Sequence, residues 1–221
     1  MSSEKLSNFR TAGFYICERI RTPDYLNIKS TEMLTVSACF GDIHPKWEVF
    51  MGRGCWLDGE EEEYKRLLGL NEEEYLGFSN KVGELFDNGR IDVDGRFIFY
   101  YDAAEMYERY FSLDRFRLVS ISAEEKYFDV LKNELNKGSF CSGVMNGDED
   151  TSELLGYDIL GWDYSNYHSF LCNNLHEGLP DIRFNDLCLL DNDYEEVCGF
   201  ADMIKGFGEP VEWLPFRIGK P

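Results

Sequence analysis

The sequence has little positive charge. Lysine and arginine number 22 against 42 aspartate and glutamate residues, which gives a formal net charge of −20 at pH 7, and the basic residues are scattered along the chain. A protein that binds DNA or RNA needs basic groups that displace counterions from phosphates, and an anionic membrane surface repels a strongly acidic protein. The composition therefore argues against nucleic acid and membrane surfaces as partners and favours a cationic partner.

Long apolar runs and closely paired cysteines are also missing. No stretch approaches the roughly 18 apolar residues of a membrane span, and residues 1–5 lead into no apolar segment of a signal peptide. The seven cysteines are odd in number, widely spaced and without a C-x-x-C pair, and several lie inside apolar runs. This pattern indicates reduced thiols rather than a disulfide framework or a zinc site, so we expect a protein of the reducing cytoplasm.

No motif for catalysis or for a cofactor is present. The glycine-rich residues 52–54 are too short for a phosphate-binding loop and lack its lysine. The acidic loops at 146–150 and 191–193 do not match the calcium-binding pattern. Runs of carboxylates such as 58–63 are typical of solvated helix starts, and nothing distinguishes an acid–base pair among them. We therefore predict no cofactor and no bound metal.

The apolar pattern predicts a mixture of strands and helices. Apolar residues make up 43% of the chain and aromatic residues 15%, which is ample for a hydrophobic core. Alternating apolar positions predict strands at residues 14–20, 31–40, 116–122 and 154–164. Residues 91–101 are predicted to form a strand or a hairpin, with a turn at Asp94-Gly95. Three- and four-residue spacings predict helices at residues 71–88, 102–111, 122–138, 166–177 and 193–205.

This order of elements lacks the regular alternation of a doubly wound sheet. Pro210 and Pro215 place the last segment, 211–218, at a sheet edge or on the surface. We predict a single α+β domain over residues 1–221, in which a mixed or antiparallel sheet packs with several helices. Residues 138–152 form a weak boundary, and strands on both sides of it can share one sheet.

One group of residues has the chemistry of a metal site. His168, Cys172 and His176 are spaced at i, i+4 and i+8 on one side of the predicted helix 166–177, with Asp163 nearby. Eight residues of helix span about 12 Å, however, so both histidines cannot reach one ion. Cys172 is assigned to the core, and the sequence leaves open whether an adjacent His–Cys pair has a chemical role.

The last third of the chain is almost purely acidic. Residues 146–202 contain fourteen aspartates and glutamates and a single base, Arg183. Aromatic residues gather at the junction between the predicted strand 154–164 and the helix that follows. Tyrosine and tryptophan are common interface anchors, and flanking carboxylates can pair with a partner's arginines or lysines. The predicted partner-binding residues are Trp162, Asp163, Tyr164, Tyr167, Asp191, Asp193 and Glu195.

The same region resembles a known class of proteins. The runs LGYDILGWD at 155–163 and HSFLCNNL at 168–175, the helix with YEEV and FAD at 194–202, and the acidic, aromatic-rich build resemble bacterial cytosolic immunity proteins of polymorphic-toxin and contact-dependent inhibition systems. The resemblance implies a non-enzymatic protein that binds a cognate toxin domain tightly. Toxin domains of this kind are often basic nucleases, which an acidic inhibitor complements.

Two other functions compete with this interpretation. One is a small cytosolic hydrolase that uses histidine and cysteine or carboxylate residues, since a thiolate beside a base is a nucleophile. The other is a protein-interaction domain with no toxin partner. The oligomeric state is not determined by the sequence.

Overall fold

A single antiparallel sheet forms the centre of the protein. The computed structural model describes residues 8–34, 36–37, 39–40, 62, 65–66, 68–92, 95–111, 114–136, 143–163 and 166–221. The strand order is β2-β1-β3-β6-β4-β5, and every neighbouring pair is antiparallel. The strands are β1 (Phe9–Arg21), β2 (Glu32–Leu34), β3 (Phe116–Glu124), β4 (Glu153–Asp163), β5 (Asn166–Ser169) and β6 (Leu214–Lys220).

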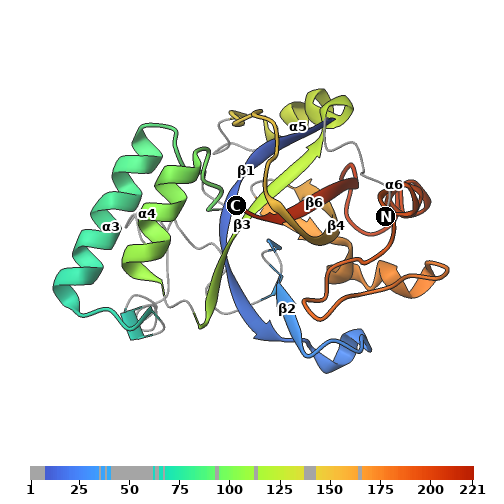
Figure 1. The fold of residues 1–221 in the computed structure, drawn as a ribbon, viewed down its shortest axis with the longest axis horizontal. Coiled ribbons are helices and arrows are strands. Elements are labelled where there is room, and N and C mark those ends of the chain that lie inside the picture. Colours follow the sequence, from blue (N-terminus) through green and yellow to red (C-terminus); the bar gives the residue numbers. More distant parts are fainter. Residues whose placement is uncertain are drawn as a thin grey trace.

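Helices pack on both sides of this sheet (Figure 1). The α-helices in the described residues are α3 (Glu72–Asp87), α4 (Tyr100–Tyr110), α5 (Phe128–Leu135) and α6 (Tyr194–Met203). Short 3-10 helices lie between the strands: η2 (Asp24–Leu26), η3 (Glu125–Tyr127), η4 (Phe170–Asn173) and η5 (Leu175–Gly178). The prediction of an α+β fold with an antiparallel sheet and several helices is confirmed. Because β3 lies beside β6 and β6 beside β4, strands from both sides of residues 138–152 share the sheet.

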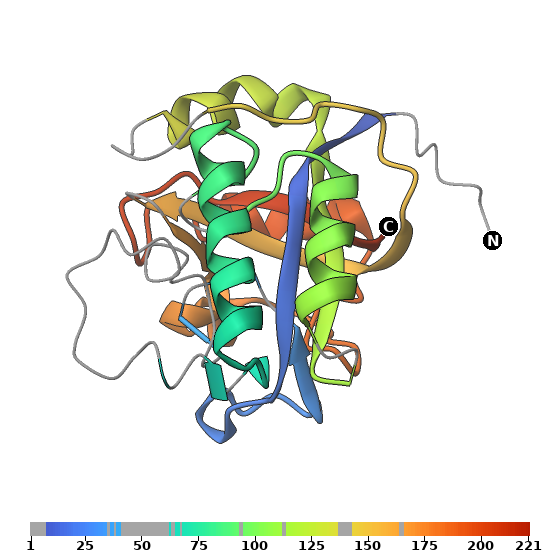
Figure 2. The ribbon, with the colours of Figure 1, turned by 90° about the vertical axis from the view of Figure 1, so that its left-hand side faces the viewer.

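The helices α3 and α4 lie side by side across β1 (Figure 2). α3 begins at Asn71 as the sequence predicts: Asn71 Oδ1 accepts a hydrogen bond from Glu74 N at 3.0 Å, and Glu74 Oε2 accepts one from Asn71 N at 2.8 Å. The apolar positions that recur every three or four residues are buried against the sheet. They meet Phe14 and Phe116 in the first of three hydrophobic clusters.

The curled sheet encloses a second cluster on its other face. Alternation along β1 points Phe14 toward the helices and Tyr15 toward this second cluster, where α5 closes one end. On the outer side of β4, Tyr157 and Ile159 join a third cluster that α6 covers. The same alternation along β4 places Trp162 in the second cluster.

Several sequence expectations about these elements are wrong. Among the described residues of 31–40 only Glu32–Leu34 form a strand, and residues 91–101 contribute isolated antiparallel bridges at Ile91 and Phe97 before α4 begins at Tyr100. Residues 166–177 form β5 followed by η4 and η5, not a helix. The predicted helix start at Ser122 lies inside β3, which continues to Glu124. The last segment is also no edge strand, since β6 lies between β3 and β4. Pro215 is tolerated there because β6 pairs with β3 only through Arg217–Gly219, so the missing N–H of Pro215 lies outside that ladder.

Among the residues that the structure describes, no helix combines the length and the apolar character that crossing a bilayer requires.

Candidate functional site

The acidic segment 177–202 covers the outer face of β4. Its middle is fixed to the sheet by two backbone hydrogen bonds, from Tyr157 N to Leu190 O at 3.0 Å and from Leu190 N to Tyr157 O at 2.8 Å. α6 follows and packs onto β4 through Val197 and Phe200. Glu196 Oε2 accepts a hydrogen bond from Asp193 N at 3.1 Å, which fixes the first turn of α6. A rigid scaffold therefore carries the carboxylates of this segment.

The acidic side chains of this segment lie on the surface. The exposed carboxylates are Glu177, Asp181, Asp186, Asp191, Asp193, Glu195, Glu196 and Asp202. The one base within residues 177–202 is Arg183, and its Nη2 already lies 3.1 Å from Glu196 Oε2. The hydrogen bonds from Asn192 and Asp193, with the Arg183 charge, hold the pKa of Glu196 below its usual value. The segment therefore presents negative charge that its own base does not balance.

A small hollow lies between β4 and the start of α6, beside two of the exposed carboxylates. It has a volume of about 230 Å³, and its lining includes Asp191, Asp193, Leu190 and Leu154. Leu154 is 43% exposed. An aliphatic wall beside two exposed carboxylates suits the methylene stem and cationic head of a lysine or arginine side chain. Asp191, Asp193 and Glu195 thus lie where the sequence-based hypothesis needs them, on the surface.

The prediction that aromatic side chains of this region contact a partner is wrong for Trp162 and Tyr167. Trp162 is 3% exposed and Tyr167 is 1% exposed, so neither ring presents surface to a partner. The two residues face each other across the β4–β5 pair, and their rings pack edge to face at 4.7 Å on the inner side of the sheet. Tyr164 and the side chain of Asp163 lie outside the described residues.

Other apolar side chains are exposed on the same part of the chain. Met203 is the last residue of α6, and Phe207 follows it in a turn flanked by glycines; both are exposed. The backbone of Phe207 is fixed, because Trp213 Nε1 donates a hydrogen bond to Phe207 O at 3.0 Å. The sequence-based reasoning missed these residues and Leu154, although an aromatic side chain between two glycines is itself a sign of a surface turn.

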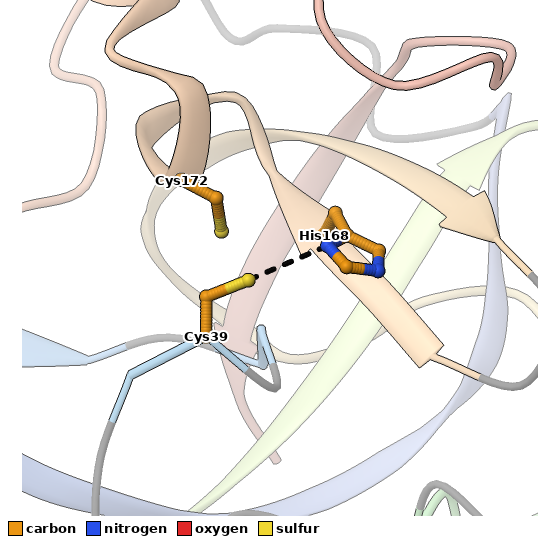
Figure 3. Close-up of side chains that lie close together, drawn as sticks. All are labelled: Cys39, His168 and Cys172. Atoms are coloured by element: carbon orange, nitrogen blue, oxygen red, sulfur yellow. Dashed lines mark hydrogen bonds between the residues drawn. The ribbon is translucent and has the colours of Figure 1, made fainter.

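A second constellation comes from three separate segments of the chain. Cys39 follows β2, His168 lies on β5 and Cys172 on η4, and the three side chains converge (Figure 3). Cys39 Sγ lies 3.4 Å from His168 Nδ1. The two sulfur atoms and Nδ1 all lie within 4.8 Å of one another. Among the described residues, this is the one group of three such side chains with the spacing of metal ligands.

This arrangement corrects the interpretation of the three residues as one side of a helix. Ser169 is extended, and its side chain accepts a hydrogen bond from Leu171 N as η4 begins, so His168 and Cys172 meet across a strand-to-helix turn. Cys172 is half-buried at the margin of the third cluster. His176 lies elsewhere, buried, with Nε2 2.9 Å from Leu26 O. Cys39 is 129 residues from His168, and no sequence pattern joins them.

The cluster favours the thiolate form of Cys39. A hydrogen bond from Cys172 is the largest cause, and hydrogen bonds from His168 and Ser37 add to it, so the pKa of Cys39 falls to about 4. The same pairing and burial raise the pKa of Cys172 well above its usual value. The cluster can therefore hold a thiolate and a thiol side by side, which suits either a nucleophile or a metal ligand.

The geometry around His168 does not resemble a cysteine–histidine–acid triad. In such a triad the acid orients the imidazole through the ring nitrogen opposite the nucleophile. Here Glu209 Oε1 lies 3.9 Å from Nδ1, the same nitrogen that faces Cys39. The ring nitrogen of His168 that faces Cys39 is thus the one nearest the acid, which is not the arrangement of a proton relay. The side chains of Cys39, His168 and Cys172 instead converge as the ligands of one cation do.

Comparison of the chain with protein-family models, with curated proteins and with solved structures returned no match. Two features of the structure therefore bear on function: the exposed carboxylates of segment 177–202 and the group formed by Cys39, His168 and Cys172.

Proposed function

We propose that this protein is a non-enzymatic binding protein that captures a basic protein partner, in the manner of an immunity protein that neutralises a toxin domain. One observation carries the proposal: the segment 177–202 presents eight exposed carboxylates and one base, which is already ion-paired. The resemblance of residues 155–175 and 194–202 to cytosolic immunity proteins supports the same conclusion, and the expected compartment is the cytoplasm.

Charge governs the first step of binding in this proposal. A net charge of −20 attracts a basic partner over several ångströms and raises the rate of encounter, an effect that salt screens. The segment 177–202 then orients the partner, because its carboxylates are fixed on a scaffold of α6 and β4. Basic toxin domains of the nuclease type bind phosphates through cationic surfaces, so an acidic protein on that surface blocks the substrate.

Short-range contacts govern release. The hollow of about 230 Å³ accepts a lysine or arginine side chain between Asp191 and Asp193, with Leu154 against its stem. Partial removal of these charges from water strengthens each pair and slows dissociation. Trp162 and Tyr167 contribute no contact, since both belong to the core.

The test begins with the gene immediately upstream of this one, which we expect to encode a large secreted protein with a basic, variable C-terminal domain. We expect expression of that domain alone to stop growth and co-expression of this protein to restore it. A neighbourhood of metabolic genes, or a toxic domain that co-expression leaves toxic, contradicts the proposal.

A charge-neutral variant then tests the surface. Asp191→Asn, Asp193→Asn and Glu195→Gln are combined; asparagine keeps the helix-capping ability at position 193. We expect association with the basic domain to slow by about five- to tenfold at low ionic strength, with a flatter dependence on salt.

The matched control removes the same charge elsewhere. Glu73→Gln, Glu108→Gln and Asp114→Asn neutralise exposed carboxylates on α3, α4 and the turn before β3. These elements lie on the side of the sheet away from α6 (Figure 1). Equal association rates for the two triple variants would assign steering to net charge alone and remove the segment 177–202 as the binding surface.

A further inference from the structure

The Cys39, His168 and Cys172 side chains have the donor types and the spacing of an open zinc site. Around a tetrahedral zinc ion, bonds of about 2.3 Å to sulfur and about 2.05 Å to nitrogen place S and N about 3.6 Å apart and two sulfurs about 3.8 Å apart. The Cys39 Sγ to His168 Nδ1 distance is 3.4 Å, and all three donor atoms lie within 4.8 Å of one another. Side-chain movements of up to about 1 Å therefore suffice to coordinate one ion.

The surroundings of the donors support ligation. Ser37 Oγ lies 2.9 Å from Cys172 Sγ and accepts a hydrogen bond from Cys39 N at 3.2 Å, which holds the two cysteines on either side of one point. Asn173 Nδ2 donates to Glu209 Oε1 at 3.0 Å and holds that carboxylate near His168. Groups that orient ligands in this way raise metal affinity.

We propose that Cys39, His168 and Cys172 bind one thiophilic divalent cation, zinc in the first instance, with water in the fourth position. Soft thiolates and an imidazole select zinc over the hard cations magnesium and calcium, which prefer oxygen. Cys39 is exposed, so solvent reaches the fourth position.

The ion would link parts of the chain that lie far apart in sequence. Cys39 belongs to the segment after β2, at one edge of the sheet order, whereas His168 and Cys172 belong to β5 and η4 at the other edge. A metal bound by both therefore closes a loop of about 130 residues, and it stabilises the folded state by mass action. This role is independent of the carboxylates at 191–195.

Cobalt(II) is the probe for the first experiment. The full-length protein is reduced with a phosphine, freed of metal with a chelator and titrated with cobalt(II), which reports thiolate ligation by a charge-transfer band and four-coordination by strong visible bands. We expect one equivalent to bind with both signatures and zinc to displace it. A reduced wild-type protein without a thiolate–cobalt band overturns the proposal.

Single cysteine variants locate the ion. Cys39→Ser changes an exposed side chain, so we expect a folded protein whose zinc affinity falls by about 100-fold or more. We expect a similar fall in zinc affinity for Cys172→Ser. Cys198→Ser, a half-buried cysteine on α6 outside the cluster, is the matched control and should bind like wild type. Circular dichroism checks that each variant is folded.

Zinc should also raise the melting temperature of the wild type and of Cys198→Ser, and leave that of Cys39→Ser unchanged. Wild-type affinity in Cys39→Ser, or an equal thermal shift in it, places any bound ion elsewhere and overturns the proposal.

Discussion

The carboxyl group of Asp158 makes the stability of the core depend on pH. Asp158 lies on β4 among the second cluster, where its Oδ1 accepts hydrogen bonds from Ile159 N and from Ser169 Oγ, both at 2.8 Å. Burial raises its pKa from 3.8 to about 7, and these two hydrogen bonds offset only part of that effect. Burial is also the main reason that the pKa values of Cys17 and Cys188 rise, and the charge of Asp158 adds to both.

The direction of the effect follows from proton binding. Between pH 3.8 and about pH 7 the folded protein keeps a proton on Asp158 that the unfolded chain releases, so stability falls as pH rises through this window. Linkage with these two pKa values gives a loss of about 2.6 kcal/mol between pH 5 and pH 8. Well below pH 3.8 both states keep the proton, so the contribution of Asp158 is constant there.

Asp158→Asn removes this titration while keeping an oxygen that can accept both hydrogen bonds. We expect the variant to gain about 2.6 kcal/mol relative to the wild type as pH rises from 5 to 8. The measurement is the free energy of unfolding from denaturant titrations at both pH values. The exposed Asp202→Asn on α6 is the control for removal of one surface charge.

The comparison of variant with wild type cancels the titration of all other groups. A difference between Asp158→Asn and wild type that stays constant from pH 5 to pH 8 would refute the reasoning. It would mean that Asp158 is ionised in the folded state at pH 5, with water or a cation close to it.

Two further predictions follow from the burial and charge of single side chains. Trp162→Ala should lower the free energy of unfolding by about 3–5 kcal/mol, because it empties part of the second cluster. The folded variant should keep wild-type affinity for the basic partner. A loss of affinity without a loss of stability would instead identify Trp162 as a contact residue. Iodoacetamide should alkylate Cys39 of the metal-free, reduced protein at a nearly constant rate from pH 6 to pH 8, because its pKa of about 4 keeps the thiolate formed, and Cys172→Ser should slow the reaction at pH 6. Peptide mapping by mass spectrometry measures this rate, and a rate in the wild type that rises about tenfold per pH unit contradicts the lowered pKa.

Local sequence patterns were sufficient for elements with strong signals. The capping box at Asn71 and the apolar face of α3 are present in the structure as predicted, because both depend on interactions within a few residues. The strands at 14–20, 116–122 and 154–164 were also found, since alternation marks a strand whose two faces differ. The α+β class follows from these elements without any tertiary information.

Pairing between distant segments decided the elements that the sequence misplaced. Residues 166–177 carry apolar positions at helical spacing, yet the antiparallel partner β4 holds residues 166–169 as a strand. Once that strand forms, Tyr167 lies opposite Trp162 and both rings enter the core. Helical periodicity is a local signal. Here the backbone hydrogen bonds between β4 and β5 and the burial of two aromatic side chains stabilise the strand more than local periodicity stabilises a helix.

The sequence by itself determined the charge of this protein, because charge follows from composition alone. It also determined the class of the fold and the exposed carboxylates at Asp191, Asp193 and Glu195, because strand alternation and helix starts depend on residues close in sequence. Only the tertiary structure decided which aromatic rings are exposed, since that depends on which face of β4 points inward. It also decided that Cys39 meets His168 and Cys172. A curled sheet brings its two edges together, and no spacing along the chain records that closure.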